Sequence, residues 1–167
     1  RPLTFSKHLY IEKEDFLEEA GKKFFRLTLG KEVRLKSGYI IKAESVIKDS
    51  SGAIEDVVCS YDPKSKSGSG TEESKRKVKG TLHWVSQQDA VPVQIREYDR
   101  LFMVPEPGSD GKDFIEDINS ESLKIKKGFA EASLKEAKHG SRYQFQRKGY
   151  FVVDKDSVPE KIVFNKV

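Results

Sequence analysis

The chain has 167 residues, of which 36% are hydrophobic and 35% charged, and its formal net charge is +4. A chain of this length forms one domain or two small lobes around a core that needs no disulfides, and its 10% aromatic content excludes a disordered protein. No apolar run reaches about 18 residues and no charged and apolar leader opens the chain, so we expect neither a membrane-spanning helix nor a secretion signal.

Apolar and polar residues alternate at strand spacing through the first half of the chain. This pattern predicts strands at residues 8–11, 33–47 (with a break near Ser37-Gly38), 53–61 and 77–86. Acidic residues after Ile11 predict a short helical stretch that ends at Ala20. Residues 63–74 are rich in Ser, Gly and Lys, and we expect a mobile loop there.

The second half continues the same pattern. Strands are expected at residues 91–104, 123–126, 142–147, 150–153 and 163–167, with short helical turns at 114–118 and 132–137. Many short strands without a long amphipathic helix predict an all-β barrel or sandwich. The Pro- and Gly-rich residues 105–111 are the candidate boundary between two lobes, 1–104 and 105–167. Because the chain begins and ends within these patterns, we expect it to be a fragment of a longer protein.

Positive charge is concentrated in one segment. Residues 22–42 contain one acidic residue, Glu32, and seven basic residues, an excess larger than the net charge of the chain: Lys22, Lys23, Arg26, Lys31, Arg34, Lys36 and Lys42. Charge focused in this way favours an anionic partner.

Three of these cations are candidate nucleic-acid contacts. Arg34 and Lys36 share one face of the predicted strand, opposite Val33 and Leu35, and cations about 7 Å apart match the phosphate spacing of a nucleic-acid strand. A solvated polar face fits this pattern as well. Arg26 lies among apolar residues. Its guanidinium is either held rigid to recognise a partner, or it lies on the surface over the aliphatic part of its own side chain.

A second candidate pair lies near the other end of the chain. Gln144 and Arg147 offer an amide and a guanidinium that suit the edges of bases, although a polar strand end would look the same. Being three residues apart, they lie on opposite faces of a regular strand. They can converge only if the chain bends, which the nearby Gly149 makes feasible.

Catalytic and metal-binding motifs are absent from the sequence. The three histidines are far apart, and none has a Cys, Asp or Glu at metal-ligand spacing. The lone Cys59 follows two valines, so we expect a buried thiol, and a single cysteine suits a reducing compartment.

Several strings resemble, in collinear order, the anticodon-binding region of glutaminyl-tRNA synthetases. They are FLEEA (16–20), RLTLGKEVRL (26–35), YIIKA (39–43), KVKGTLHWVS (77–86), VQIREYDRLF (93–102), FQRKGYF (145–151) and VFN (163–165). The resemblance implies two β-barrels with a few short helices, at the C-terminal end of a class I aminoacyl-tRNA synthetase. It also implies that a catalytic domain, which binds ATP and glutamine, precedes residue 1.

The resemblance assigns the candidate residues to the three anticodon bases of tRNA(Gln). Arg26 matches the arginine that recognises the third base. Arg34 and Lys36 match the basic pair at the first base and its phosphate. Gln144 and Arg147 match the pair that holds the middle uracil.

The resemblance also carries expectations for the fragment as a whole. It should bind tRNA without aminoacylating it, and it should hold neither cofactor nor metal, since ATP binds elsewhere in the full-length enzyme. We expect the full-length enzyme to be a cytoplasmic monomer. Two alternatives are RNA-binding barrels, one of a glutamyl-tRNA synthetase and one of a protein that binds ribosomal RNA. A protein-interaction barrel is a third, and it would make the basic segment incidental.

Overall fold

The computed structural model describes residues 2–167, so Arg1, where the first expected lobe begins, lies outside the described residues. The chain divides into two compact units, Thr4–Gln88 and Asp89–Val167, and Pro2 and Leu3 belong to the second. We call them the N-terminal and C-terminal units.

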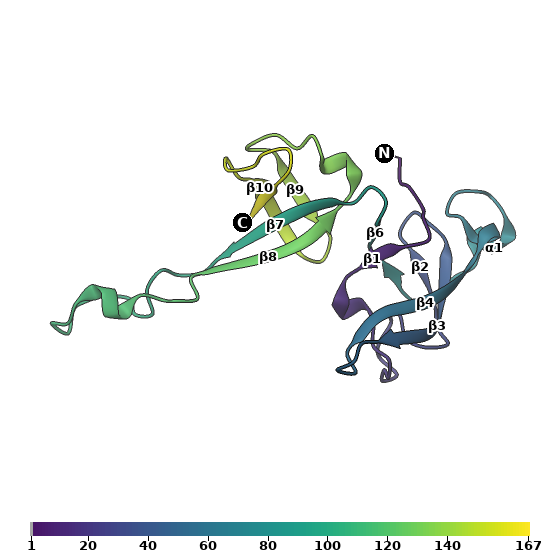
Figure 1. Cartoon of the computed structure of the whole chain (residues 1–167), viewed down its shortest axis with the longest axis horizontal. Helices are drawn as coiled ribbons and strands as arrows, with labels where there is room; N and C mark the ends of the chain where they lie inside the picture. The colour runs from purple at the N-terminus through teal and green to yellow at the C-terminus, as the bar shows by residue number, and fades with distance from the viewer. Residues whose placement is uncertain (1) are drawn as a thin grey trace. The chain divides into compact units, whose positions relative to one another are not determined.

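The described residues of the N-terminal unit form two sheets and three short helices. Figure 1 shows the strands of this unit and α1. A two-stranded sheet pairs β1 (Leu9–Ile11) with β6 (Trp84–Ser86). A four-stranded sheet has the order β4-β3-β2-β5, made of β2 (Glu32–Leu35), β3 (Ile40–Lys48), β4 (Ile54–Asp62) and β5 (Thr81–Leu82). The helices are η1 (Lys13–Asp15), η2 (Pro63–Ser65) and α1 (Glu72–Lys75).

Alternation along β2 builds the core of this unit. Val33 and Leu35 are completely buried, whereas Glu32 and Arg34, which alternate with them, are partly exposed on the opposite face. The buried cluster consists of Phe16, Leu27, Val33, Leu35, Ile41, Ala43, Leu82 and Trp84. Gly80 allows the backbone before Leu27 to pass close to β5, since its φ is +115° and a Cβ there would lie 2.2 Å from the carbonyl oxygen of Phe25.

The C-terminal unit contains one five-stranded sheet in the order β8-β7-β11-β10-β9. Its strands are β7 (Val91–Tyr98), β8 (Leu123–Ala130), β9 (Arg142–Phe145), β10 (Gly149–Val153) and β11 (Ile162–Lys166), and its helices are η3 (Phe114–Asp117) and η4 (Ala132–Leu134). β11 pairs in parallel with β7, and the other neighbouring strands are antiparallel.

The boundary between the units lies at Gln88/Asp89, not at residues 104/105 where composition placed it. β7 pairs along its length with β8 and also pairs with β11, so residues on both sides of the Pro- and Gly-rich segment belong to one sheet. The segment lies beyond the ends of the β7–β8 ribbon (Figure 1). It connects two strands of one unit and is not a linker between units.

The all-β class with a few short helices is confirmed. Among the described strands, the order of each sheet is open and does not close on itself. Residues 12–20 are helical only over η1. Residues 63–74, expected to be a mobile loop, contain η2 and the start of α1, with Ser65 fully buried. The prediction of a buried Cys59 is wrong: the residue is exposed, because it lies on β4, an edge strand whose residues are mostly exposed.

Candidate nucleic-acid interface

Arg26 is held beside η1 by a short bridge between two backbone segments. Leu27 N–H donates to the Asp15 carbonyl (3.0 Å), and Leu17 N–H donates to the Leu27 carbonyl (3.2 Å). The Arg26 Nη1 donates to the Glu14 carbonyl (3.0 Å) and lies 3.3 Å from the Asp15 Oδ1. The Asp15 side chain is completely buried, whereas that of Arg26 is 36% exposed. Both contacts use Nη1 and hold the guanidinium beside η1, and neither involves Nη2 or Nε.

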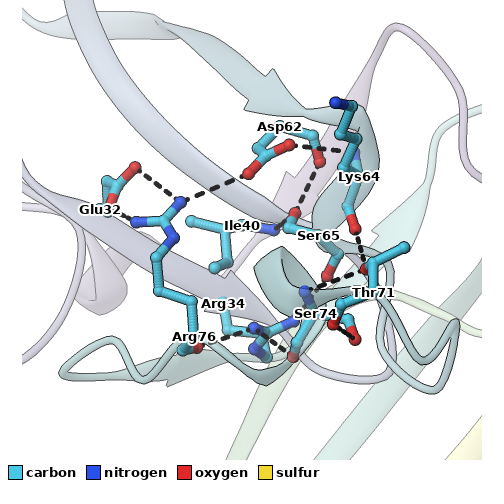
Figure 2. Close-up of polar contacts among 9 residues, drawn as sticks. All are labelled: Glu32, Arg34, Ile40, Asp62, Lys64, Ser65, Thr71, Ser74 and Arg76. Carbon is cyan, nitrogen blue, oxygen red and sulfur yellow. Dashed lines mark hydrogen bonds and ion pairs between the residues drawn. The ribbon is translucent and has the colours of Figure 1, made fainter.

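Arg34 extends from the outer face of β2 into the segment 63–76 (Figure 2). Its Nη1 donates to the carbonyl of Ser65 (2.8 Å) and to the Oγ of Ser67 (3.3 Å). Its Nη2 donates to the carbonyls of Ser74 and Arg76, both at 3.1 Å. Each terminal nitrogen carries two N–H groups, so these four hydrogen bonds use all of them.

The strength of these bonds bears on what Arg34 can contact. A hydrogen bond from a charged donor contributes about 1.5–3 kcal/mol to stability. A good bidentate contact with a base supplies about 1–3 kcal/mol of discrimination. Moving both terminal nitrogens of Arg34 from their four acceptors to a base would therefore cost more free energy than the base contact returns.

Lys36 begins the turn between β2 and β3, and its backbone is fixed on both sides. Its N–H donates to the Leu82 carbonyl (2.9 Å), and its carbonyl accepts from the Trp84 Nε1 (2.9 Å). The next residue, Ser37, has φ of +58°, and Gly38 N–H donates to the Leu35 carbonyl (2.8 Å). The side chain of Lys36 is exposed, so an ammonium group projects from a turn with a defined backbone.

Aromatic side chains gather next to this turn, and the sequence reasoning missed them. The Tyr39 ring lies 4.7 Å from that of Phe5 and 5.4 Å from that of Tyr61 between ring centroids, and Phe5 also contacts Trp84 at 5.8 Å. Tyr61 is 52% exposed. The signal in the sequence is weak, because these four residues come from four separate segments.

Gln144 and Arg147 are placed by the hairpin of β9 and β10. Tyr143 and Phe145 pack into the core of the C-terminal unit, the second stacked on Phe151 with centroids 4.5 Å apart, so Gln144 between them is exposed. β9 ends at Phe145, and Lys148 N–H donates to the Phe145 carbonyl (2.9 Å) to close a turn. Arg147 occupies this turn with φ of +67°. The bend that convergence required is therefore present, and Arg147 itself forms part of it.

Tyr150 is a further candidate in this hairpin that the sequence reasoning missed. It is the cross-strand partner of Gln144, and its side chain is 62% exposed. Opposed residues of an antiparallel pair project from the same face, so the tyrosine ring and the amide lie side by side. The alternation of exposed Tyr150 with buried Phe151 is the signal that could have identified it.

Some of the positive charge of residues 22–42 is neutralised locally. Arg26 pairs with Asp15, and Lys42 lies 3.2 Å from Glu44. Of the five predicted site residues, Arg26, Arg34 and Lys36 lie in the N-terminal unit, and Gln144 and Arg147 lie in the C-terminal unit.

Residues 2–167 contain no cluster of three or more His, Cys, Asp or Glu residues that could hold a metal ion. In the same residues, no helix has the length and apolar character needed to cross a membrane.

Two family models match the chain, each described as the anti-codon binding domain of class I tRNA synthetases (E and Q). One matches residues 1–62 and the other residues 81–154. Three curated relatives, all named glutamine–tRNA ligase, come from Proteus mirabilis, Rhodopirellula baltica and Escherichia coli O157:H7. They are 51%, 50% and 52% identical to this chain and match 99%, 100% and 99% of it.

The chain spans less than a third of the length of these relatives: 29%, 28% and 30% respectively. Nearly the full chain matches these relatives, and the two family models match residues 1–62 and 81–154 of it. The chain therefore belongs to the anticodon-binding domains of the class I tRNA synthetases specific for Glu and Gln.

Proposed function

We propose that this chain recognises the anticodon of tRNA(Gln), as part of a longer protein that ligates glutamine to that tRNA with ATP. The observation that carries the proposal is the match of nearly the full chain, at about half identity, to glutamine–tRNA ligases. On this proposal the remainder of the protein supplies ATP binding and catalysis, and the protein acts as a cytoplasmic monomer.

The chemistry of the exposed side chains supports this assignment. A guanine edge offers two acceptors, which suit the Arg26 guanidinium, and the third anticodon base of tRNA(Gln) is guanine. A uracil edge offers a donor and acceptors, which suit the amide of Gln144 together with Arg147. The exposed ring of Tyr150 next to Gln144 offers a face on which an unstacked base can lie.

Lys36 has a different role in this proposal. Its ammonium is a compact charge without a planar fork, which suits a phosphate oxygen next to the first base. We expect Lys36→Ala to weaken binding to all tRNAs alike and to reduce the salt dependence of binding by about one unit of slope.

The decisive experiment measures the affinity of the full-length protein for three tRNA transcripts that differ only in the anticodon. One carries a glutamine anticodon, one has the middle uracil replaced, and one has the third guanine replaced by cytosine, as in glutamate anticodons. We expect each replacement to weaken binding about 5- to 150-fold. Equal affinity for all three transcripts would exclude anticodon recognition, and tighter binding of the cytosine transcript would indicate a glutamate-specific protein.

A further inference from the structure

The four acceptors of Arg34 lie on both limbs of the segment 63–76. Ser65 and Ser67 belong to the limb that leaves β4, and Ser74 and Arg76 belong to the limb that leads toward β5. Figure 2 shows the guanidinium lying between the two limbs. Three of the four acceptors are backbone carbonyls, so the contacts fix the path of the chain and not only side-chain positions. Arg34 thus holds the two ends of the segment 63–76 together.

A second arginine strengthens the same closure. The guanidinium of Arg76 forms a paired contact with the carboxylate of Glu32, and its Nη2 lies 3.5 Å from the Asp62 Oδ2 (Figure 2). The hydrogen bond from Arg76 to Glu32 raises the pKa of the guanidinium. Glu32 and Arg34 are two residues apart on the outer face of β2, so both side chains of this face bind the segment.

The closed segment is in turn bonded to the turn that carries Lys36. Both the N–H and the Oγ of Ser67 donate to the Gly38 carbonyl at 2.9 Å. The buried hydroxyl of Ser65 accepts from Ile40 N–H (2.8 Å), at the start of β3. The segment therefore supports residues 38–40, whereas β5 and Trp84 hold the backbone of Lys36.

We propose that Arg34 is a positioning residue for tRNA binding, which acts through the segment 63–76 on the turn that presents Lys36, and not a residue that contacts a base. This inference rests on the proposed function, since it concerns the same tRNA. On this inference Arg34 fixes the conformation of the site, and Lys36 contacts the phosphate.

The test compares Arg34→Ala, Arg34→Lys, Lys36→Ala and the double variant Arg34→Ala/Lys36→Ala in the full-length protein. Lys42→Ala is the matched control, because Lys42 is a half-exposed cation on the neighbouring strand that pairs with Glu44. Amide hydrogen exchange at Ser67 and Ile40 measures the closure of the segment without any tRNA. Affinity is measured for a tRNA with a glutamine anticodon and for one with a purine at the first anticodon position.

We expect Arg34→Ala to raise exchange at Ser67 and Ile40 about tenfold or more, since it removes several hydrogen bonds from a charged donor. Lys36→Ala and Lys42→Ala should leave exchange unchanged. Arg34→Ala should weaken binding of both tRNAs by the same factor, about tenfold, and should add less than about twofold to the effect of Lys36→Ala. Arg34→Lys should behave like Arg34→Ala in exchange, because an ammonium cannot reach both limbs.

Three results would overturn the inference. The first is loss of first-base discrimination in Arg34→Ala with unchanged exchange, which would make Arg34 a base contact. The second is full rescue of affinity by Arg34→Lys while exchange stays raised, which would make its charge sufficient. The third is full additivity with Lys36→Ala.

Ser67→Ala gives the same test with a milder change if Arg34→Ala does not fold, because it removes only the hydroxyl contacts with Arg34 and Gly38. Raised exchange at Ser67 with equal loss of affinity for both tRNAs would support the inference, and unchanged affinity would overturn it. If no tRNA binds, the proposed function fails. The exchange result still shows whether Arg34 closes the segment.

Discussion

Replacement of Arg26 by alanine should reduce both stability and recognition of the third anticodon base, and the two effects can be separated. The Arg26 guanidinium approaches a completely buried carboxylate, that of Asp15, and also donates to the Glu14 carbonyl. Arg26→Ala removes both contacts and takes a cation away from a buried anion. A lysine at this position keeps the positive charge near Asp15 but loses the planar fork.

The magnitude follows from the burial of the two partners. Removing one partner of a fully buried ion pair costs about 3–5 kcal/mol, whereas a fully exposed pair contributes about 0–1 kcal/mol. Asp15 belongs to the first case, but Arg26 is 36% exposed, so water replaces part of the lost interaction. We expect Arg26→Ala to lower the free energy of unfolding by about 2 kcal/mol and Arg26→Lys by less than about 1 kcal/mol.

Urea unfolding and tRNA binding together form the assay. In a double-mutant cycle with Asp15→Asn, the coupling energy should be at least about 1 kcal/mol, because the two side chains are in direct contact. The preference for guanine over cytosine at the third anticodon position should fall about 5- to 150-fold in Arg26→Ala and by a smaller factor in Arg26→Lys. A coupling energy near zero would refute the argument from the buried carboxylate, and an unchanged preference for guanine would refute the assignment of Arg26 to the third base.

Three further outcomes are expected. Arg147→Gly should be more stable than Arg147→Ala by about 1 kcal/mol in urea unfolding, since both lose the side chain but only glycine adopts a φ of +67° without strain; equal stabilities would contradict this. Hydrogen bonds from Asp156 N–H and the Asn165 amide hold the pKa of Asp154 below its ordinary value, so the carboxylate stabilises the fold above that value and the stabilisation is lost as pH falls through the lowered pKa. The stability difference between wild type and Asp154→Asn should therefore shrink between about pH 6 and pH 2, and a constant difference would exclude this role. Although Cys59 is exposed, neighbouring atoms desolvate its sulfur and raise the thiol pKa to about 11, so alkylation by iodoacetamide at pH 8 should be about tenfold slower than for a free cysteine.

Local patterns predicted the strands well, because alternation within a few residues decides which face of a strand is buried. The strand break near Ser37-Gly38 and the turn before β4 were both found in this way. The boundary between the units was not, because it depends on the pairing of β7 with β8 and of β7 with β11. These pairings join segments far apart in sequence, and composition around residue 105 contains no information about them.

The same limit applies to the candidate residues, because local patterns place them on strands but do not show what they contact. Arg34 and Lys36 share strand parity in the sequence, but β2 ends at Leu35, so Lys36 already belongs to the turn. What separates their roles is the set of acceptors that surrounds Arg34, most of them backbone carbonyls. Every residue has a carbonyl, so no sequence pattern marks the ones that a folded chain brings to a guanidinium.

Positive charge counted along a sequence therefore overstates the charge available to an anionic partner. Within and beside the basic segment, Arg34 and Arg76 are committed to the segment 63–76, and Arg26 shares its guanidinium with Asp15. The side chain of Lys36 is exposed and projects from a turn whose backbone is fixed by Leu82 and Trp84. On this argument Arg34 and Arg76 define the shape of the site in the N-terminal unit, and Lys36, presented by that shape, supplies the charge that meets the phosphate.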